Sequence, residues 1–157
     1  MKLIRITAAG TLMFGIAFCG VAAAASEPSM VRGHGSGIYV HPPFTGDRVS
    51  VDLDASGSGG RFDVVHYDKL GNVFAHLSGT LDCVTVSGRQ AFTTGTITAG
   101  SAPEVVGNVA GKAFAITILD NGDADVVGVS YPLEQIPACS PWPLNTTIDQ
   151  GSYTIGG

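Results

Sequence analysis

The stretch that decides the fold class is residues 62–99, FDVVHYDKLGNVFAHLSGTLDCVTVSGRQAFTTGTITA. Apolar and polar residues alternate over 62–68 and again over 73–85, which is the pattern of half-buried β-strands. The turn-forming run 69–72, Lys-Leu-Gly-Asn, separates the two alternating segments. The stretch therefore predicts two antiparallel strands joined by a tight turn.

A two-residue loop at Leu70-Gly71 sets the register of this hairpin. It faces Phe62 with Gly79, and the pairs that follow are Val64 with Leu77 and His66 with Ala75. Directly paired residues share one face of an antiparallel ladder. The more apolar face, which we expect inside, holds Phe62, Val64, His66, Val73, Ala75, Leu77, Leu81 and Cys83. A slip of one residue would turn this whole set outward, so the pattern favours this pairing.

The next turn, around Gly88, leaves two registers open. A three-residue loop over 87–89 pairs Cys83 with Thr93, Leu81 with Gly95 and Gly79 with Ile97. A two-residue loop would instead place Cys83 against Phe92. The first is preferred because it brings Ile97 inward.

The rest of the chain repeats this style. Asn121-Gly122 between two alternating runs predicts a hairpin that pairs Ile118 with Asp125, Ile116 with Val127 and Phe114 with Val129. Residues 132–144 carry four prolines and are expected to form an extended cover, with Trp142 closing one end of the core. Strands are expected at 35–41, 48–54, 61–68, 73–79, 80–87, 90–99, 112–120 and 123–131, with a short last one at 151–155.

Successive short hairpins predict an all-β fold, a small antiparallel up-and-down barrel of about eight strands. Closure into a barrel removes the exposed strand edges. A two-layer β-sandwich remains the alternative.

The N-terminal segment, residues 1–25, has the form of a secretory signal peptide. Lys2 and Arg5 precede an apolar run, and Ala23-Ala24-Ala25 is a small-residue cleavage pattern. A membrane anchor and lipid attachment at Cys19 are the less favoured alternatives. We expect a single β domain over residues 26–157, located outside the cell, or in the periplasm if the host has an outer membrane.

The charge balance of the mature chain restricts its partners. Of eight basic residues, cleavage removes Lys2 and Arg5 and leaves six, against thirteen acidic ones, a formal charge of −7. An acidic, lightly charged chain lacks the electrostatic footprint for nucleic acid or for an anionic membrane. We therefore expect no nucleic-acid partner, and no membrane contact after cleavage.

Two cysteines, Cys83 and Cys139, remain after cleavage. An even number in an exported chain favours a disulfide between them, and two free thiols are the alternative. A metal site is not expected, because neither cysteine has a second Cys or a His at ligand spacing. No cofactor is indicated.

The run 81–91, LDCVTVSGRQA, followed by Gly95-Thr96-Ile97 and the ending GSYTI at 151–155, resembles a group of small exported bacterial β-proteins of unknown activity. The resemblance implies export and a β-barrel-like domain. It brings no catalytic residue with it.

Three functions remain, and a non-enzymatic binding or extracellular interaction role is preferred. The inward residues that would line a pocket for a small apolar ligand are Phe62, Val64, His66, Leu77, Phe114 and Ile116, although eight strands leave little more than side-chain room. Exposed Val65, Tyr67 and Phe74 would instead form a contact patch for an extracellular protein. A hydrolase or isomerase would use the inward His66, for which no nucleophile or triad is evident.

Overall fold

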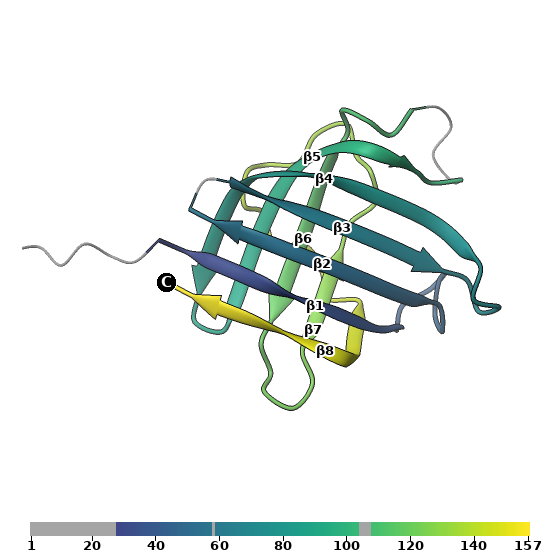
Figure 1. The fold of residues 1–157 in the computed structure, drawn as a ribbon, viewed down its shortest axis with the longest axis horizontal. Coiled ribbons are helices and arrows are strands. Elements are labelled where there is room, and N and C mark those ends of the chain that lie inside the picture. Colours follow the sequence, from purple (N-terminus) through teal and green to yellow (C-terminus); the bar gives the residue numbers. More distant parts are fainter. Residues whose placement is uncertain (1–27, 58, 104–107) are drawn as a thin grey trace, which may run out of the picture.

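Eight antiparallel strands, taken in chain order, close into a barrel in a computed structural model of the chain (Figure 1). The structure describes residues 28–57, 59–103 and 108–157. The strands are β1 (Met30–Tyr39), β2 (Arg48–Ser56), β3 (Gly59–Tyr67), β4 (Val73–Ser87), β5 (Gln90–Ser101), β6 (Ala113–Leu119), β7 (Val126–Val129) and β8 (Thr146–Gly156). The prediction of an up-and-down barrel is confirmed, and the sandwich alternative is wrong.

Closure depends on β8, which returns along β1 from Met30↔Gly156 to Tyr39↔Thr146. The sequence predicted only a short final strand there. Conversely, the two strands expected at 73–79 and 80–87 are one continuous strand, β4. None of the described residues forms a helix that is long and apolar enough to cross a membrane. The expected signal peptide, residues 1–25 with Cys19, lies outside the described residues.

The β3–β4 ladder has the predicted register, with Phe62↔Gly79, Val64↔Leu77 and His66↔Ala75. Phe62 is buried and stacks on Phe114 of β6, with ring centroids 4.9 Å apart and planes inclined by 14°. Gly79 is needed opposite Phe62, because a Cβ there would lie 2.7 Å from the Phe62 ring. This stacked pair forms the middle of the core.

A β-bulge at the start of β4 reverses the faces that were predicted for Val73 and Phe74. His66 pairs with Ala75, but the next pair is Tyr67↔Val73, so Phe74 is left without a partner. An extra residue on one strand reverses the alternation beyond it. Val73, expected inside, is therefore 61% exposed, and Phe74, expected on the surface, packs against the core.

A second bulge, at Asp82, decides where the disulfide lies. Beyond it Leu81↔Gly95 and Gly79↔Ile97 pair as predicted, but on the turn side the pairs are Cys83↔Thr94 and Ser87↔Gln90. The turn is thus a two-residue loop, and neither register considered for Cys83 is right. Leu81 and Val84 are the buried residues here, so Cys83 is directed out of the barrel instead of into its core.

Cys83 forms the predicted disulfide with Cys139, with Cα atoms 5.4 Å apart. Cys139 belongs to residues 132–144, which we call the strap, and which runs over the outside of the barrel. The Trp142 N–H donates to Thr117 Oγ1 at 2.7 Å, and the Cys139 N–H donates to Thr94 Oγ1 at 2.9 Å. The expected cover is therefore present, but Trp142 is half-buried on the outer wall and does not close an end of the core.

The β6–β7 hairpin has the predicted faces and a different register. The pairs are Ile118↔Val127 and Ile116↔Val129, two residues away from those predicted. Since a shift of two preserves the side-chain alternation, Phe114, Ile116 and Val127 are still buried. The turn lengthens because Asp120 accepts from the Gly122 N–H at 3.0 Å.

The two ends of the barrel differ in their connections. The turn end carries the β2–β3, β4–β5 and β6–β7 connections. The aromatic end carries the β1–β2, β3–β4, β5–β6 and β7–β8 connections. Aliphatic side chains fill the turn end, with Val31, Leu53, Leu81, Ala91 and Ile118 all buried. Rings gather at the aromatic end.

Candidate ligand-binding site

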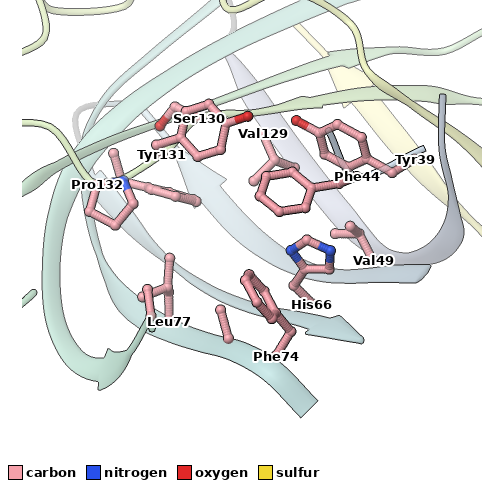
Figure 2. Close-up of a pocket in the computed structure, with 13 residues that line it drawn as sticks. Tyr39, Phe44, Val49, His66, Phe74, Leu77, Val129, Ser130, Tyr131 and Pro132 are labelled. Atoms are coloured by element: carbon pink, nitrogen blue, oxygen red, sulfur yellow. The ribbon is translucent and has the colours of Figure 1, made fainter. Parts of the chain in front are cut away.

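A cavity of ≈ 70 Å³ lies inside the barrel at the aromatic end (Figure 2). Its wall combines rings with aliphatic side chains from six strands and three connections. The lining residues that matter for its chemistry are Tyr39, Phe44, His66, Phe74, Leu77 and Tyr131. Neither a carboxylate nor a lysine or arginine side chain is among the described residues that line it. The site is therefore apolar, with a few neutral polar groups.

Phe44 is the centre of the ring cluster. It comes from the β1–β2 connection and is buried. Its ring centroid lies 4.9 Å from that of His66, 5.8 Å from Tyr39, 5.6 Å from Phe74 and 6.0 Å from Tyr131. The contacts with His66 and Tyr39 are edge-to-face, which is a favoured geometry for aromatic pairs. Phe44 thus roofs the cavity over the open ends of the strands.

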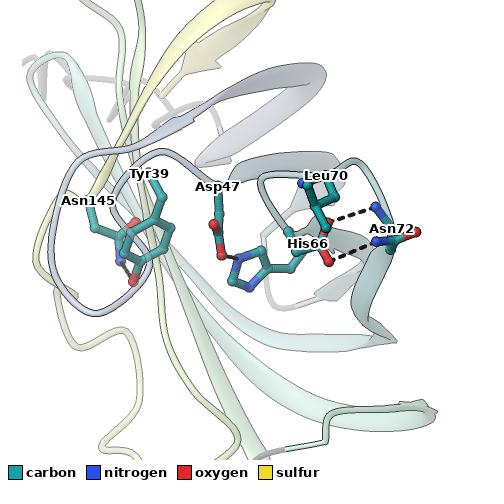
Figure 3. A network of polar contacts seen from close by, with 7 residues as sticks. Tyr39, Asp47, His66, Leu70, Asn72 and Asn145 are labelled. Carbon is teal, nitrogen blue, oxygen red and sulfur yellow. Dashed lines mark hydrogen bonds and ion pairs between the residues drawn. The ribbon is translucent and has the colours of Figure 1, made fainter.

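Tyr39 is fixed at the last position of β1 by Asn145 (Figure 3). The Asn145 Nδ2 donates to the Tyr39 hydroxyl at 2.8 Å and to the Val129 carbonyl at 2.9 Å. The Asn145 Oδ1 accepts from the Val129 N–H at 3.2 Å, so the buried amide is fully used. Burial raises the pKa of Tyr39 well above its usual range, and the neighbouring Tyr131 hydroxyl raises it further. Tyr39 therefore stays neutral.

His66 and Asp47 form a hydrogen bond inside this cluster (Figure 3), with His66 Nε2 2.9 Å from Asp47 Oδ2. Their side chains are 13% and 11% exposed. Asp47 is held by its backbone, because its N–H donates to Phe44 O and its carbonyl accepts from the Tyr39 N–H, each at 2.9 Å. The imidazole is thus oriented by a carboxylate that the β1–β2 connection places.

The other histidine–aspartate contacts lie on the outer wall. His34 pairs with Asp52 at 3.0 Å and His76 with Asp63 at 2.8 Å, and all four side chains are about half exposed. Within the described ranges, no group of three or more His, Cys, Asp or Glu side chains is placed to hold a metal ion. The His66–Asp47 pair differs from these because it is buried and its imidazole lines the aromatic cavity, whereas Asp52 and Asp63 line an open depression on the outer wall.

The structure divides the six residues predicted to line a pocket. His66, Leu77 and Phe114 line the cavity. Phe62, Val64 and Ile116 point inward as expected, but they are core residues away from the cavity wall. Phe74, predicted as part of a surface patch with Val65 and Tyr67, is turned into the cluster by its bulge.

The sequence analysis did not identify four of the rings that line the cavity. Tyr39 ends a strand, Phe44 and Tyr131 lie in connections, and Phe74 lies at a bulge. A signal for them did exist. In an up-and-down barrel, alternate connections meet at the same end, and all four residues fall at or beside connections of one parity. The alternation of apolar and polar residues within strands, on which the prediction relied, does not show which residues meet at one end of the barrel.

No family model matches the chain, and neither a curated protein nor a solved structure matches it.

Proposed function

We propose that this chain is an exported, non-enzymatic binding protein that holds a small apolar ligand at the aromatic end of its barrel. The observation that carries the proposal is the ≈ 70 Å³ cavity walled by rings and aliphatic side chains. A concave, mostly apolar pocket with few polar groups is the usual form of a small-molecule site. Mouths of small barrels hold such ligands in other proteins.

The cavity volume limits the ligand. One buried water needs about 10–15 Å³ of such space, and pockets for drug-sized molecules measure roughly 300–1,000 Å³. A volume of ≈ 70 Å³ is about half of the roughly 150 Å³ that encloses benzene in an engineered cavity of another protein, so the largest suitable ligand is a short branched chain or a single ring that stays partly exposed at the rim. A long acyl chain would not be enclosed.

The rim of the aromatic end also supports the proposal. The large hydrophobic side chains that are exposed in the described part of the chain are Val40, Leu70, Val73 and Tyr131. All four lie on or beside the connections of this end. An apolar rim eases the entry of an apolar molecule, whereas the surface patch predicted for a protein partner has lost Phe74 to the interior. A small ligand is thus the better-supported partner.

Export is the second part of the proposal. The Cys83–Cys139 disulfide is compatible with an extracellular or periplasmic location, because disulfides persist in oxidising compartments. Mass spectrometry of the protein recovered from its own host reports the cleavage site and the two-hydrogen loss of the disulfide. A chain that retains residues 1–25 would contradict export by a cleaved signal.

Titration with toluene and indole, followed by methyl NMR, tests the binding function. We expect saturable shifts at Leu77 and Val129, with a dissociation constant below about 1 mM, equivalent to roughly 4 kcal/mol of binding free energy. Ala75→Leu should abolish binding, because Ala75 lines the cavity. The control is Ala99→Leu, on the exposed part of β5. No saturable shift with either probe, or equal binding by the Ala75→Leu variant, would contradict the proposal.

The His66–Asp47 contact favours acid–base catalysis as a second candidate, because a carboxylate beside an imidazole is the arrangement of an oriented general base. Among the described residues no hydroxyl or thiol is hydrogen-bonded to His66. An isomerase is therefore better supported than a hydrolase. The test is turnover of any molecule that copurifies with the protein, measured in folded His66→Gln. Turnover that persists in this variant excludes His66 as the base.

A further inference from the structure

We propose that His66 makes the cavity selective for neutral single-ring ligands that carry a hydrogen-bond donor, such as a hydroxyl or an N–H group. This inference rests on the proposed binding function and names its ligand class. The selectivity would come from one nitrogen of the His66 ring.

The surroundings of His66 leave one polar atom available. The ring is stacked parallel to Tyr39, with centroids 6.0 Å apart and planes inclined by 8°, and meets Phe44 and Phe74 at centroid distances of 4.9 and 5.0 Å. Nε2 is used by Asp47 at 2.9 Å. Nδ1 makes no hydrogen bond to any described residue. The imidazole is directed into the space between Phe44, Phe74 and Leu77 (Figure 2).

That nitrogen is not sealed in the protein. Among the described residues, no side-chain nitrogen or oxygen is both fully buried and without a hydrogen-bond partner. Since His66 is a lining residue, the open space next to the ring is the cavity. A ligand in the cavity therefore comes within reach of Nδ1.

Asp47 decides the chemistry that Nδ1 offers. An ionised carboxylate only accepts hydrogen bonds, so in the neutral imidazole the proton lies on Nε2. Nδ1 is then an acceptor. A ligand that donates to it forms a hydrogen bond in a water-poor site, whereas a ligand without a donor leaves the acceptor unpaired. Sites built in this way discriminate strongly against an analogue that lacks the matching group.

Charged ligands have no partner in this wall. The described lining residues offer no lysine or arginine to an anion and no carboxylate to a cation. Removing a charge from water without a partner is costly. The ligand class is therefore neutral.

Phenol and toluene, which have the same number of heavy atoms, are the matched probes. Their affinities for the mature protein are measured by calorimetry or NMR titration. We take the ratio of the toluene to the phenol dissociation constant, because it removes the shared contribution of the ring. In His66→Phe this ratio should fall about tenfold, since a hydrogen bond to an otherwise unpaired acceptor is lost. A smaller fall is expected in Asp47→Asn, whose amide no longer dictates the tautomer.

The outer wall supplies a matched control. His76→Phe and Asp63→Asn remove the same groups from a pair with a similar contact distance, 2.8 Å, that lies on the outer wall and does not line the aromatic cavity. Both should leave the ratio unchanged. If His66→Phe fails to fold, long-range ¹H–¹⁵N spectra of the unaltered protein provide the test. The Nδ1 resonance should move with phenol and not with toluene.

The outcomes separate the two proposals. If Ala75→Leu abolishes the binding of both probes but the ratio of their dissociation constants is unchanged in His66→Phe, the selectivity is overturned and the binding function remains supported. Benzoate or benzylamine binding more tightly than phenol would overturn the neutral class. Failure of both phenol and toluene to bind would overturn the binding function itself, and the selectivity with it.

Discussion

The two ends of the barrel bury a carboxylate in different ways. At the turn end, Asp125 accepts from the backbone N–H groups of Tyr153, at 2.8 Å, and of Asn121, at 3.2 Å. At the aromatic end, Asp47 is satisfied by the His66 side chain. A backbone donor has no second function, but an imidazole has another nitrogen. The turn end is therefore chemically closed, and the aromatic end keeps a group for a ligand.

The packing of side chains also differs between the turn end and the aromatic end. Near the turn end the Tyr153 ring lies over β1 so closely that a Cβ on Gly35 would be 2.8 Å from its Cε2 atom. The Tyr153 hydroxyl donates to Val51 O at 2.9 Å. The aromatic end instead leaves ≈ 70 Å³ unfilled between its rings. The turn end is tightly packed, whereas the aromatic end contains a cavity.

The largest effect should come from the disulfide. Cys83→Ser with Cys139→Ser should lower the free energy of unfolding by roughly 4 kcal/mol, as expected in the chain-entropy model for a closed loop of this size. The strap leads from Tyr131 to Asn145, so the loss should loosen the aromatic end first. Amide hydrogen exchange checks this by comparing Val129 with Ile118. Equal loss of protection at the two ends would break the comparison.

The next effect concerns the two carboxylates. Asp125→Ala should cost about 3 kcal/mol, because it leaves two backbone donors of the turn end without an acceptor. Asp47→Ala should cost about half as much, since the released imidazole can reach water or a ligand in the cavity. Urea denaturation measures both. Asp125→Asn, which keeps one of the two oxygen acceptors, is the control and should recover only part of the loss.

A third pair of substitutions tests the packing. Gly35→Ala should destabilise the protein by about 2 kcal/mol, because overpacking a filled core forces neighbouring atoms to move. Ala75→Leu adds more atoms but fills the cavity, so its cost should stay below about 1 kcal/mol. Gly59→Ala is a neutral control, because its new Cβ would meet only Leu81 O at 3.8 Å. Equal costs for Gly35→Ala and Ala75→Leu would show that the cavity is not free space.

The smallest effect is a loss of stability in alkali. Burial raises the pKa of Tyr153 well above its usual range, and the negative charges of Asp52 and Asp125 raise it further. A raised pKa favours the neutral form in the folded state, so its contribution is complete below the unfolded pKa of about 10 and is lost as the pH rises above it.

The expected loss is about 1.4 kcal/mol per pH unit for this one group. Denaturation midpoints between pH 9 and 11 measure it, and Tyr153→Phe should flatten the slope. An unchanged slope in that variant would mean that Tyr153 already ionises within the folded barrel.

Particular residues show how far prediction reached. The pairs Phe62↔Gly79 and Val64↔Leu77 were predictable because a short turn joins two long alternating runs. The Cys83–Cys139 pairing was predictable from the expected export and from the even number of cysteines in the expected mature chain. Phe74 was misplaced, and so was the direction of Cys83, because one bulged residue reverses a face without changing the composition of the strand.

The candidate site was predictable only in part. His66, Leu77 and Phe114 were expected inside, since alternation identifies inward positions. Asp47 and Phe44 were not found, because each lies in a connection where no periodicity applies. Their partners are distant in sequence, and only the folded chain brings them together.

The sequence by itself determined the all-β class, most of the strand positions and most of the inward faces, and it favoured a barrel over a sandwich, because alternation with a period of two and tight turns are local properties of the chain. Only the tertiary structure decided the β1–β8 closure, the bulges at Phe74 and Asp82, and the ring cluster around His66. These depend on which distant backbone and side-chain groups compete for the same space and the same hydrogen bonds.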